Sequence, residues 1–572
     1  LSDIQCMRIE ISHCGIYYGT CRTIVCNTVL NLRIEGFMVY LFSCERLCPG
    51  RLMIPATMWT FVFHFLVTVV ALNNVVVANE LLPAAGKQPH IVMIFVDDWG
   101  WANVGYHRQV PTREVQTPNF DWLCKQGIEL DQHYAFRVCS PSRSSLISGR
   151  LPLHVNIQNI QPNVYNPNDT VSGFQGIPRF MTGIGAKMKA AGYATHQVGK
   201  WDAGMATPDH TPAGRGFDTS FCYYHHDNDY YTELAGSCNY NHHQVNLTDL
   251  WTTDGPGAGY NGTLYEEALF SNQVLKVISS HPKETPLFLY YAPHIVRKPY
   301  EVPQEYLDRF DFIDTPNRRV YHAMVTYLDD VVGNLTEALN STGLWENTLI
   351  VVSSDNGGPV HALSGANNYP LKGGKATNWQ GGVRVNAFVS GGFVPEDMRG
   401  KKVDGYIALA DWYATFCSLA GVDKTDERAK AARLPPVDGL DMWPMISGEN
   451  MTSPRTEIPL SSGLISGDYK ILVGKNALAG WTGPQYPNNT NPTGGINATE
   501  QCGTTGCLYN IKADPYEHVN LANKSPSILK HMQERLAAWK ATLFDPDRGK
   551  EWHGACEVAV EKYGGFWGPF LP

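Results

Sequence analysis

Short, fully apolar runs recur along this chain, and segments with helical periodicity separate them. Runs of this kind, rich in β-branched residues, are typical of buried parallel strands, and they cover Ile91–Val96, Leu287–Tyr291, Leu349–Val352 and Ala387–Val389. Helices are predicted over Pro178–Ala191, Arg318–Ser341 and Ile407–Ala420, each followed within two residues by a glycine that can end it. The alternation predicts an α/β fold with a mostly parallel sheet flanked by helices.

The pattern changes around Pro435–Pro454, which suggests a domain boundary. Beyond it come a strand-like run at Tyr469–Val473, a stretch rich in Gly, Pro and Asn over 480–506, and a helical segment near Ser527–Thr542. We therefore expect a larger domain over 88–449 and a smaller C-terminal α+β subdomain over 450–572.

The N-terminal region differs from the rest. No charged residue lies between Arg51 and Glu80, and the apolar segment Trp59–Leu72 is followed by Val76-Val77-Ala78, small residues suited to a cleavage site. This pattern predicts a secretory signal peptide over 53–78, and an upstream segment, 1–52, without a fold. The alternative is a retained signal anchor, but an apolar core of about 14 residues is short of the roughly 20 that span a bilayer. We expect a protein of the secretory pathway, secreted or lysosomal, with no stable membrane anchor after cleavage.

Charge and cysteine content narrow the function classes. The chain has 45 basic and 54 acidic residues, a net charge of −9, and no long basic run, so we expect no nucleic-acid partner. Eight cysteines follow residue 78, an even number that favours disulfides, and eight Asn-x-Ser/Thr sequons favour a glycoprotein. Cys222 and Cys238 bracket a stretch rich in His and Tyr that could contact a sugar or be a plain surface loop. If bridged, they would add roughly 3 kcal/mol of constraint. Cys502 and Cys507 are expected to close a small turn.

Polar residues follow two of the predicted strands directly. Asp97-Asp98 comes after Ile91–Val96, and Asp355-Asn356 comes after Leu349–Val352. In open α/β sheets, ligands bind beyond the carboxyl ends of the strands. Either pair alone could be a turn, but together they form a hard-oxygen donor set, which suits Ca²⁺ or Mg²⁺.

Cys139 opens the sequence Cys139-Ser140-Pro141-Ser142-Arg143, which continues to Gly149-Arg150. Proline here marks a helix start, and a helix N-terminus favours anionic groups. With Gly-Arg after it, this segment resembles the signature of the sulfatase family, in which the cysteine is oxidised to formylglycine. Other family motifs occur in the family's order: Asp97-Asp98, Gly199-Lys200-Trp201, His294, Asp355-Asn356-Gly357-Gly358 and Lys375. The segments Asn368–Lys375 and Trp379–Arg384, and the tail Gly565–Pro569, resemble the arylsulfatase B (N-acetylgalactosamine-4-sulfatase) branch.

The resemblance implies an alkaline-phosphatase-like fold and hydrolysis of sulfate esters, on a sulfated carbohydrate. It implies a metal, Ca²⁺ or else Mg²⁺, held by Asp97, Asp98, residue 139, Asp355 and Asn356. Hydrated formylglycine would supply one hydroxyl to attack sulfur and a second whose deprotonation expels sulfate. Lys200 and Lys375 would stabilise the sulfate oxygens, His294 would donate to the leaving group, and Arg143 would hold residue 139 and the carboxylates. A formylglycine-generating enzyme is the implied partner during maturation.

One position departs from the family motif. The family has Gly-Lys-Trp-His-x-Gly, whose histidine takes a proton, whereas this chain has Gly199-Lys200-Trp201-Asp202-Ala203-Gly204. Asp202 could act as the base instead, or His210 could substitute. Two alternatives remain: a phosphate or phosphonate ester hydrolase of the same fold, which Cys139 disfavours, and a non-catalytic carbohydrate-binding relative, which Asp202 motivates.

Overall fold

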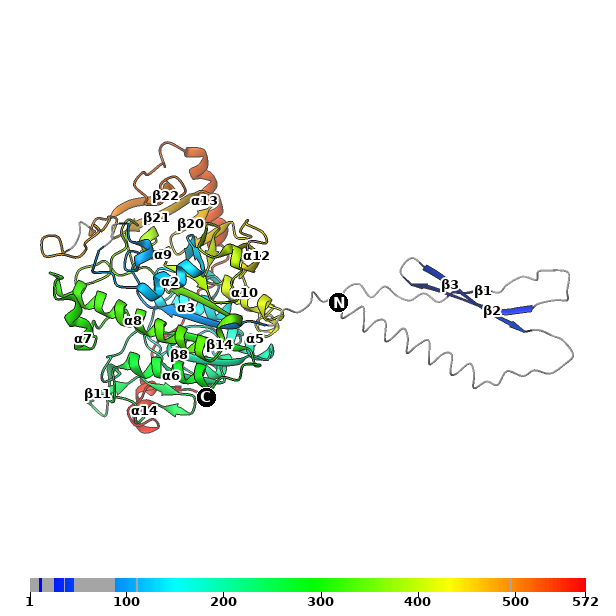
Figure 1. The fold of residues 1–572 in the computed structure, drawn as a ribbon, viewed down its shortest axis with the longest axis horizontal. Coiled ribbons are helices and arrows are strands. Elements are labelled where there is room, and N and C mark those ends of the chain that lie inside the picture. Colours follow the sequence, from blue (N-terminus) through cyan, green and yellow to red (C-terminus); the bar gives the residue numbers. More distant parts are fainter. Residues whose placement is uncertain (1–9, 13–24, 35–36, 46–87, 110–111, 493–495) are drawn as a thin grey trace. The chain divides into compact units, whose positions relative to one another are not determined.

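The computed structural model describes residues 10–12, 25–34, 37–45, 88–109, 112–492 and 496–572 (Figure 1). It divides into two units, Leu1–Ala85 and Gly86–Pro572. In the first, β1 (Glu10–Ser12), β2 (Val25–Ile34) and β3 (Phe37–Glu45) form an antiparallel sheet in that order. The sequence predicted no folded element over 1–52, whereas the structure describes these three strands in that segment. The predicted signal peptide, 53–78, lies outside the described residues.

The second unit, which we call the main unit, is built on a ten-stranded sheet in the order β13-β12-β9-β8-β14-β4-β15-β16-β5-β17. Its central five strands are parallel: β9 (Thr219–Tyr223), β8 (Ala194–Lys200), β14 (Leu287–Ala292), β4 (His90–Val96) and β15 (Thr348–Ser354). The outer strands are β13 (Gly255–Pro256), β12 (Trp251–Thr252), β16 (Ala387–Ser390), β5 (Ile128–Leu130) and β17 (Lys401–Val403). The strands predicted from the apolar runs are all present, but β16 pairs antiparallel with β15.

The apolar runs form central strands because both faces of the sheet are covered. Along β4, Ile91, Met93 and Phe95 enter one hydrophobic core, and Val92, Ile94 and Val96 enter the other. Helices close the two cores: α3 (Cys139–Ser148), α5 (Ile184–Ala190) and α10 (Asp411–Leu419) on the first, and α2 (Pro118–Gln126), α6 (Glu266–Ser280) and α8 (Pro316–Ser341) on the second. This three-layer arrangement confirms the predicted α/β fold.

Two predicted helices are shorter than their sequence pattern. The first begins at Ile184 instead of Pro178, because the Arg215 guanidinium binds the carbonyls of Ile177, Pro178 and Met181 and holds that segment in another conformation. The second begins at Asp411, since Ile407–Ala408 forms strand β18, which pairs with β6 (His133–Tyr134). The predicted helix Arg318–Ser341 is present as α8.

The remaining short elements connect these layers and surround the sheet edges. They are α4 (Pro152–Val155), β7 (Val164–Tyr165), β10 (Leu234–Tyr240), β11 (His243–Thr248), α7 (Gln304–Leu307), α9 (Gln380–Val383), α11 (Glu427–Ala431) and α12 (Trp443–Ile446), with 3₁₀ turns at Gly105–His107, Pro208–His210, Ala213–Arg215, Asp308–Phe310, Trp345–Asn347 and Glu396–Met398. In the described part of the chain, no helix is long and apolar enough to cross a membrane.

A separate four-stranded antiparallel sheet follows residue 450. Its strands are β19 (Glu457–Leu460), β20 (Gly463–Ser466), β21 (Tyr469–Asn476) and β22 (Glu500–Asn510), in that order. One face packs on α13 (Pro526–Lys540) through Leu529, Met532 and Leu536. The other face packs on Trp379 and Val383, which follow Lys375 in the chain. The small sheet therefore supports the segment that carries one of the predicted site residues.

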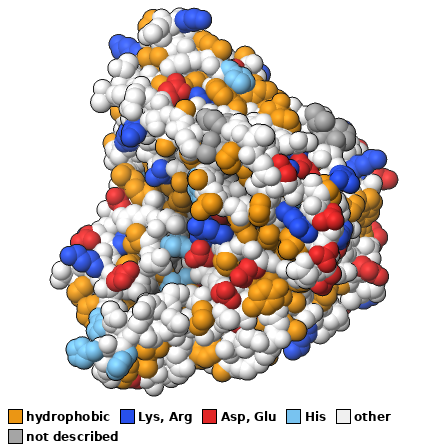
Figure 2. Space-filling view, turned by 90° about the vertical axis from the view of Figure 1, so that its left-hand side faces the viewer, with side chains coloured by type: hydrophobic (Ala, Val, Ile, Leu, Met, Phe, Trp, Pro, Cys, Tyr) orange, Lys and Arg blue, Asp and Glu red, His pale blue; other side chains and the backbone are white. Residues whose placement is uncertain are grey.

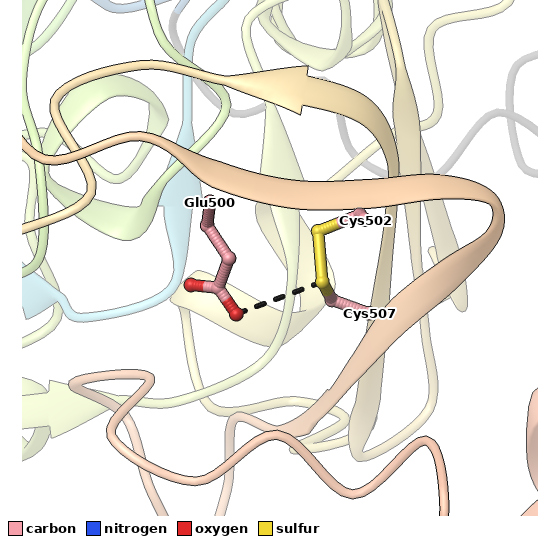
Figure 3. Close-up of side chains that lie close together, drawn as sticks. All are labelled: Glu500, Cys502 and Cys507. Carbon is pink, nitrogen blue, oxygen red and sulfur yellow. Dashed lines mark hydrogen bonds between the residues drawn. A yellow bond between two sulfur atoms is a disulfide. The ribbon is translucent and has the colours of Figure 1, made fainter.

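The expected disulfide-closed turn is confirmed. Cys502 and Cys507 of β22 form a disulfide, and Glu500 points toward it, with its Oε1 3.6 Å from Cys507 Sγ (Figure 3). These three residues lie close enough to suggest a metal cluster. However, cysteines joined in a disulfide have no thiolate to offer a metal, so this group is structural.

The tail after residue 549 packs on the first core of the main unit. β23 (Lys550–Glu551) pairs with β7, and α14 (His553–Glu561) is joined to β10 by the Cys238–Cys556 disulfide. In Figure 1, α13 and α14 lie at opposite ends of the main unit. The conditional pairing of Cys222 with Cys238 is therefore wrong, because Cys222 lies in β9 with its side chain buried in the first core. The expected domain boundaries remain predictions.

Candidate active site

The site is built where four neighbouring parallel strands end. β8, β14, β4 and β15 lie side by side, and their carboxyl ends lead into Lys200, His294, Asp97-Asp98 and Asp355-Asn356 respectively. Val96 is paired with Ser354, so the two acidic segments leave the sheet at the same level. Asp98 has a positive φ of 58°, a conformation that costs free energy for a residue other than glycine and that often marks functional sites.

Cys139 is the first residue of α3, and it is 1% exposed. Its Sγ lies 3.4 Å from Asp97 Oδ1 and 3.5 Å from Asn356 Oδ1, and Lys375 Nζ lies 3.2 Å from the same sulfur. Burial, Asp355 and Asp97 raise the pKa of the Cys139 thiol. The unmodified side chain is thus a thiol at neutral pH, and a thiol is a weak nucleophile.

Cationic side chains neutralise each carboxylate of the cluster. Lys200 Nζ lies 2.6 Å from Asp97 Oδ2, and Arg143 donates two hydrogen bonds to Asp355 Oδ2 at 2.9 and 3.1 Å. Asp98 binds Lys375 and, at 2.9 Å, Arg297 Nη1. All three acids are fully or almost fully buried.

These contacts set the ionisation of the three acids. Burial alone would raise the pKa of Asp97, but Lys200 and Arg143 hold it well below its usual range. Burial acts against ionisation of Asp98 too, and Lys375 lowers the pKa of that carboxyl. For Asp355, burial and the neighbouring Asp97 raise the pKa to about 6, against the effect of Arg143.

The cluster has the donor set of a hard-cation site. Ligand atoms of Asp97, Asp98, Cys139 and Asp355 all lie within 4.8 Å of one another, and all four residues are buried. Carboxylate and amide oxygens are the ligands that Ca²⁺ and Mg²⁺ prefer. The residues present therefore fit a divalent cation of this kind.

Lys200 reaches the site because of the glycine before it. Gly199 has a φ of +91°, and a Cβ there would lie 2.0 Å from the carbonyl oxygen of Ala292 in β14. Only glycine allows this close approach of the two strands. Beyond Lys200, the backbone N–H of Trp201 donates to Tyr223 O, and the turn places Asp202 beside the lysine.

Asp202 is fully buried, with a φ of 46°. Its Oδ1 accepts a hydrogen bond from Gln175 Nε2 at 3.0 Å, and its Oδ2 lies 2.9 Å from His226 Nδ1 and 3.6 Å from Lys200 Nζ. Burial would raise the pKa of Asp202, but His226 and Lys200 lower it below its usual range. The carboxyl is therefore ionised. His210, the other residue considered from the sequence, binds Thr207 and packs on Phe174 instead.

His294 follows β14 and is fully buried. Its Nδ1 lies 2.8 Å from Glu266 Oε2, and its ring stacks on Tyr230 with the centroids 4.0 Å apart. Burial lowers the pKa of His294 well below its usual range, so the ring is neutral at neutral pH. Among the described residues, its Nε2 has no hydrogen-bond partner.

Three residues of the site were not singled out from the sequence as site residues: Arg297, His226 and Gln175. Arg297 links Asp98 to Asp227, with Nη2 2.9 Å from Asp227 Oδ2. No motif marks Arg297 or Gln175. His226 and Asp227 belong to the His- and Tyr-rich stretch after Cys222, which was noted only as a possible sugar contact. That stretch does join the site, through His226 to Asp202 and through Asp227 to Arg297.

The face of the main unit drawn in Figure 2 is hollowed. Figure 2 shows a recess in which Lys or Arg, His, and Asp or Glu side chains lie close together. A cavity of about 260 Å³ is lined by His225 and Asp227 together with Trp567 of the tail. The ring centroids of His225 and Trp567 lie 5.0 Å apart. A small polar cavity with an aromatic wall therefore adjoins the segment that carries His226.

The comparisons with known proteins agree with this geometry. The sulfatase family model matches residues 89–422. Arylsulfatase J of Mus musculus is 32% identical, with 85% of this chain and 81% of the relative covered, and N-acetylgalactosamine-6-sulfatase of Mus musculus is 30% identical, with 66% and 70% covered. The crystal structure of Ps i-CgsB in complex with k-i-k-neocarrahexaose is similar with a TM-score of 0.63 at 25% identity, covering 83% of this chain and 97% of that one. The chain therefore belongs to the sulfatase family, whose members are sulfuric ester hydrolases.

Proposed function

We propose that this chain hydrolyses sulfate esters of a sulfated carbohydrate, with formylglycine at position 139 and a bound divalent cation. The observation that carries the proposal is the convergence of Cys139, Asp97, Asp98, Asp355 and Asn356 at one edge of the sheet. A carbohydrate substrate is supported by the relatives, since one is named for N-acetylgalactosamine and a similar structure holds a neocarrahexaose.

The cation would be held by Asp97, Asp98, Asp355, Asn356 and residue 139. When bound, it supplies positive charge that stabilises anionic oxygen at this position. Charge balance supports this assignment. The carboxylates of Asp97, Asp98, Asp355 and Asp202 are matched by Lys200, Lys375, Arg143 and Arg297. Asp227, which shares Arg297 with Asp98, adds a fifth carboxylate against the four cationic side chains. The cluster therefore has an excess negative charge by itself, and a divalent cation would make it attractive to a sulfate group.

Formylglycine supplies, as its hydrate, one hydroxyl that attacks sulfur and a second whose loss of a proton releases sulfate. The residues around it divide the remaining work. Lys200 and Lys375 would donate to the sulfate oxygens, since both amines already lie at the cluster. Burial raises the pKa of Glu266 well above its usual range, so the protonated carboxyl donates to His294 Nδ1. The hydrogen of the neutral ring then lies on Nε2, which would donate a hydrogen bond to the leaving oxygen. Arg143 would hold Asp355 in place through its two hydrogen bonds.

Maturation in the secretory pathway is supported by two features. The disulfides Cys238–Cys556 and Cys502–Cys507 need an oxidising compartment. Cys139 is 1% exposed, so a formylglycine-generating enzyme would have to act on it before the main unit closes. We accordingly propose a secreted or lysosomal enzyme.

The decisive experiment uses the protein secreted from a host that contains the formylglycine-generating enzyme. A mass spectrum of the peptide holding residue 139 should show loss of the thiol sulfur and gain of oxygen, and metal analysis should find one Ca²⁺ or Mg²⁺ per chain. 4-Nitrophenyl sulfate should be hydrolysed, and the Cys139→Ala variant should be inactive. Unmodified cysteine in that host would overturn the proposal.

Substrate assays separate the alternatives. Faster hydrolysis of 4-nitrophenyl phosphate than of the sulfate would indicate a phosphate or phosphonate ester hydrolase. No turnover of either ester, with sulfated oligosaccharides still bound, would indicate a non-catalytic relative. Release of sulfate from defined sulfated oligosaccharides, compared between galactosamine and galactan series, would then identify the sugar.

A further inference from the structure

The Asp202 carboxylate is already engaged on both oxygens. Gln175 Nε2 donates to Oδ1, while Oδ2 lies beside His226 Nδ1 and the Lys200 amine. A proton placed on this carboxylate would remove its negative charge from the ion pair with Lys200. Asp202 is therefore poorly placed to take a proton from the reacting group, although it stands where the family motif has its histidine.

His226 has the complementary arrangement. Its side chain is 10% exposed, and a carboxylate on Nδ1 favours the tautomer with the hydrogen on that nitrogen. Nε2 is then a bare acceptor, and within the described structure it is buried without a hydrogen-bond partner. Buried polar atoms are nearly always partnered, so this nitrogen is suited to a group that the structure does not contain.

Two chains of contacts connect the pair to the reacting position. Gln175 Nε2, which binds Asp202, also donates to Ser140 Oγ at 2.6 Å, and Ser140 follows Cys139. On the other side, Arg297 Nε donates to the backbone oxygen of His226 at 3.2 Å, and the same guanidinium binds Asp98. The Asp202–His226 pair is thus held on one side by Gln175, which also binds the neighbour of Cys139, and on the other by Arg297, which also binds Asp98.

The other buried histidines of this region have different partners. His210 binds Thr207, and Trp201 Nε1 donates to its backbone oxygen. His294 is held by Glu266 and serves the leaving group in the proposed function. His225 is held by Asp249. Only His226, among the described histidines, contacts the aspartate that replaces the motif histidine.

We propose that His226 Nε2 accepts the proton that is lost when sulfate is released, and that Asp202 is the positioning residue that orients His226. This inference rests on the proposed function. In the release step, the C–O bond to sulfate breaks and sulfate leaves with its electron pair. The O–H bond of the remaining hydroxyl breaks as well; its electron pair forms the C=O bond of the aldehyde, and its proton passes to His226 Nε2.

The test compares His226→Gln with His154→Gln, a matched control outside the site whose histidine also pairs through Nδ1 with an aspartate, Asp438. In rapid mixing with 4-nitrophenyl sulfate, His226→Gln should still release about one equivalent of nitrophenol in a burst. Its steady-state kcat should then be lower by about 10²-fold or more. His154→Gln should behave like the unchanged enzyme.

Two further measurements separate a proton acceptor from a structural residue. Imidazole should restore turnover to His226→Gly and leave the turnover of His154→Gly unaffected. In ¹⁵N spectra of the protein with unmodified Cys139, the imidazole signals that are absent from the His226→Gln spectrum belong to His226. They should show the tautomer with the hydrogen on Nδ1, and Asp202→Asn should shift the tautomer equilibrium of this ring. This readout does not depend on catalysis.

Three results would overturn the inference. The first is turnover of His226→Gln at the unchanged rate, and the second is loss of its burst and its turnover in equal measure. The third is loss of turnover in Asp202→Asn with the turnover of His226→Gln unchanged, which would make Asp202 the base. If the unchanged protein has an unmodified Cys139 and shows no burst, the proposed function itself is refuted, which is a different outcome.

Discussion

The two disulfides of the main unit should differ strongly in their contribution to stability. Cys238–Cys556 joins residues 318 positions apart, whereas Cys502–Cys507 joins residues 5 positions apart. A disulfide stabilises mainly by restricting the unfolded chain, and the restriction grows with the logarithm of loop length. That relation gives about 6 kcal/mol for the long loop and about 2 kcal/mol for the short one.

The perturbation is a pair of double variants, Cys238→Ser with Cys556→Ser, and Cys502→Ser with Cys507→Ser. The free energy of unfolding, from urea titration followed by tryptophan fluorescence, should fall about 4 kcal/mol further in the first variant than in the second. The two variants are matched because each replaces two buried or half-buried sulfur atoms by the same residue.

The first variant should also loosen the tail. α14 is joined to β10 by this disulfide, and Trp567 Nε1 donates to Ala235 O at 2.7 Å. Limited proteolysis should therefore cut the tail after residue 549 earlier in this variant than in the unchanged protein. Equal destabilisation of the two variants, or greater loss in the Cys502 and Cys507 pair, would refute the loop-length reasoning.

Three further results are expected. Lys375→Ala removes the amine that binds Asp98 and lies 3.2 Å from Cys139 Sγ. The kcat for an aryl sulfate should fall about 10²- to 10³-fold, with the circular dichroism spectrum unchanged. An unchanged kcat would exclude Lys375 from the reaction. Burial raises the pKa of Glu267 to about 7, although the hydrogen bond from Tyr291 acts to lower it. The folded state therefore holds the proton of this carboxyl up to a higher pH than the unfolded chain does. Stability should thus fall by about 3 kcal/mol as pH rises from about 4.5 to 7, and Glu267→Gln should remove most of that fall in urea titrations at the two pH values. Chelation with EDTA should abolish aryl sulfate turnover, and adding back Ca²⁺ or Mg²⁺ should restore it; full activity in metal-free protein would contradict the assignment of Asp97, Asp98 and Asp355 as ligands.

The sequence by itself determined the layers and the first half of the site. A strand covered on both faces needs an unbroken apolar run, so β4, β14 and β15 could be read directly from their composition. Because parallel strands share one carboxyl edge, Asp97-Asp98 and Asp355-Asn356 had to emerge at the same edge. The Cys139 motif placed a third segment there by resemblance.

Only the tertiary structure decided which distant side chains complete the site. His226 meets Asp202, Arg297 meets Asp98, and Cys238 meets Cys556, across 24, 199 and 318 positions of the chain. The same holds for Arg215, whose guanidinium prevents a helix at Pro178. Periodicity and turn signals report on neighbours a few residues apart. Contacts of this kind depend on the direction in which each loop leaves the sheet, and that direction is set by packing among elements that the local sequence does not encode.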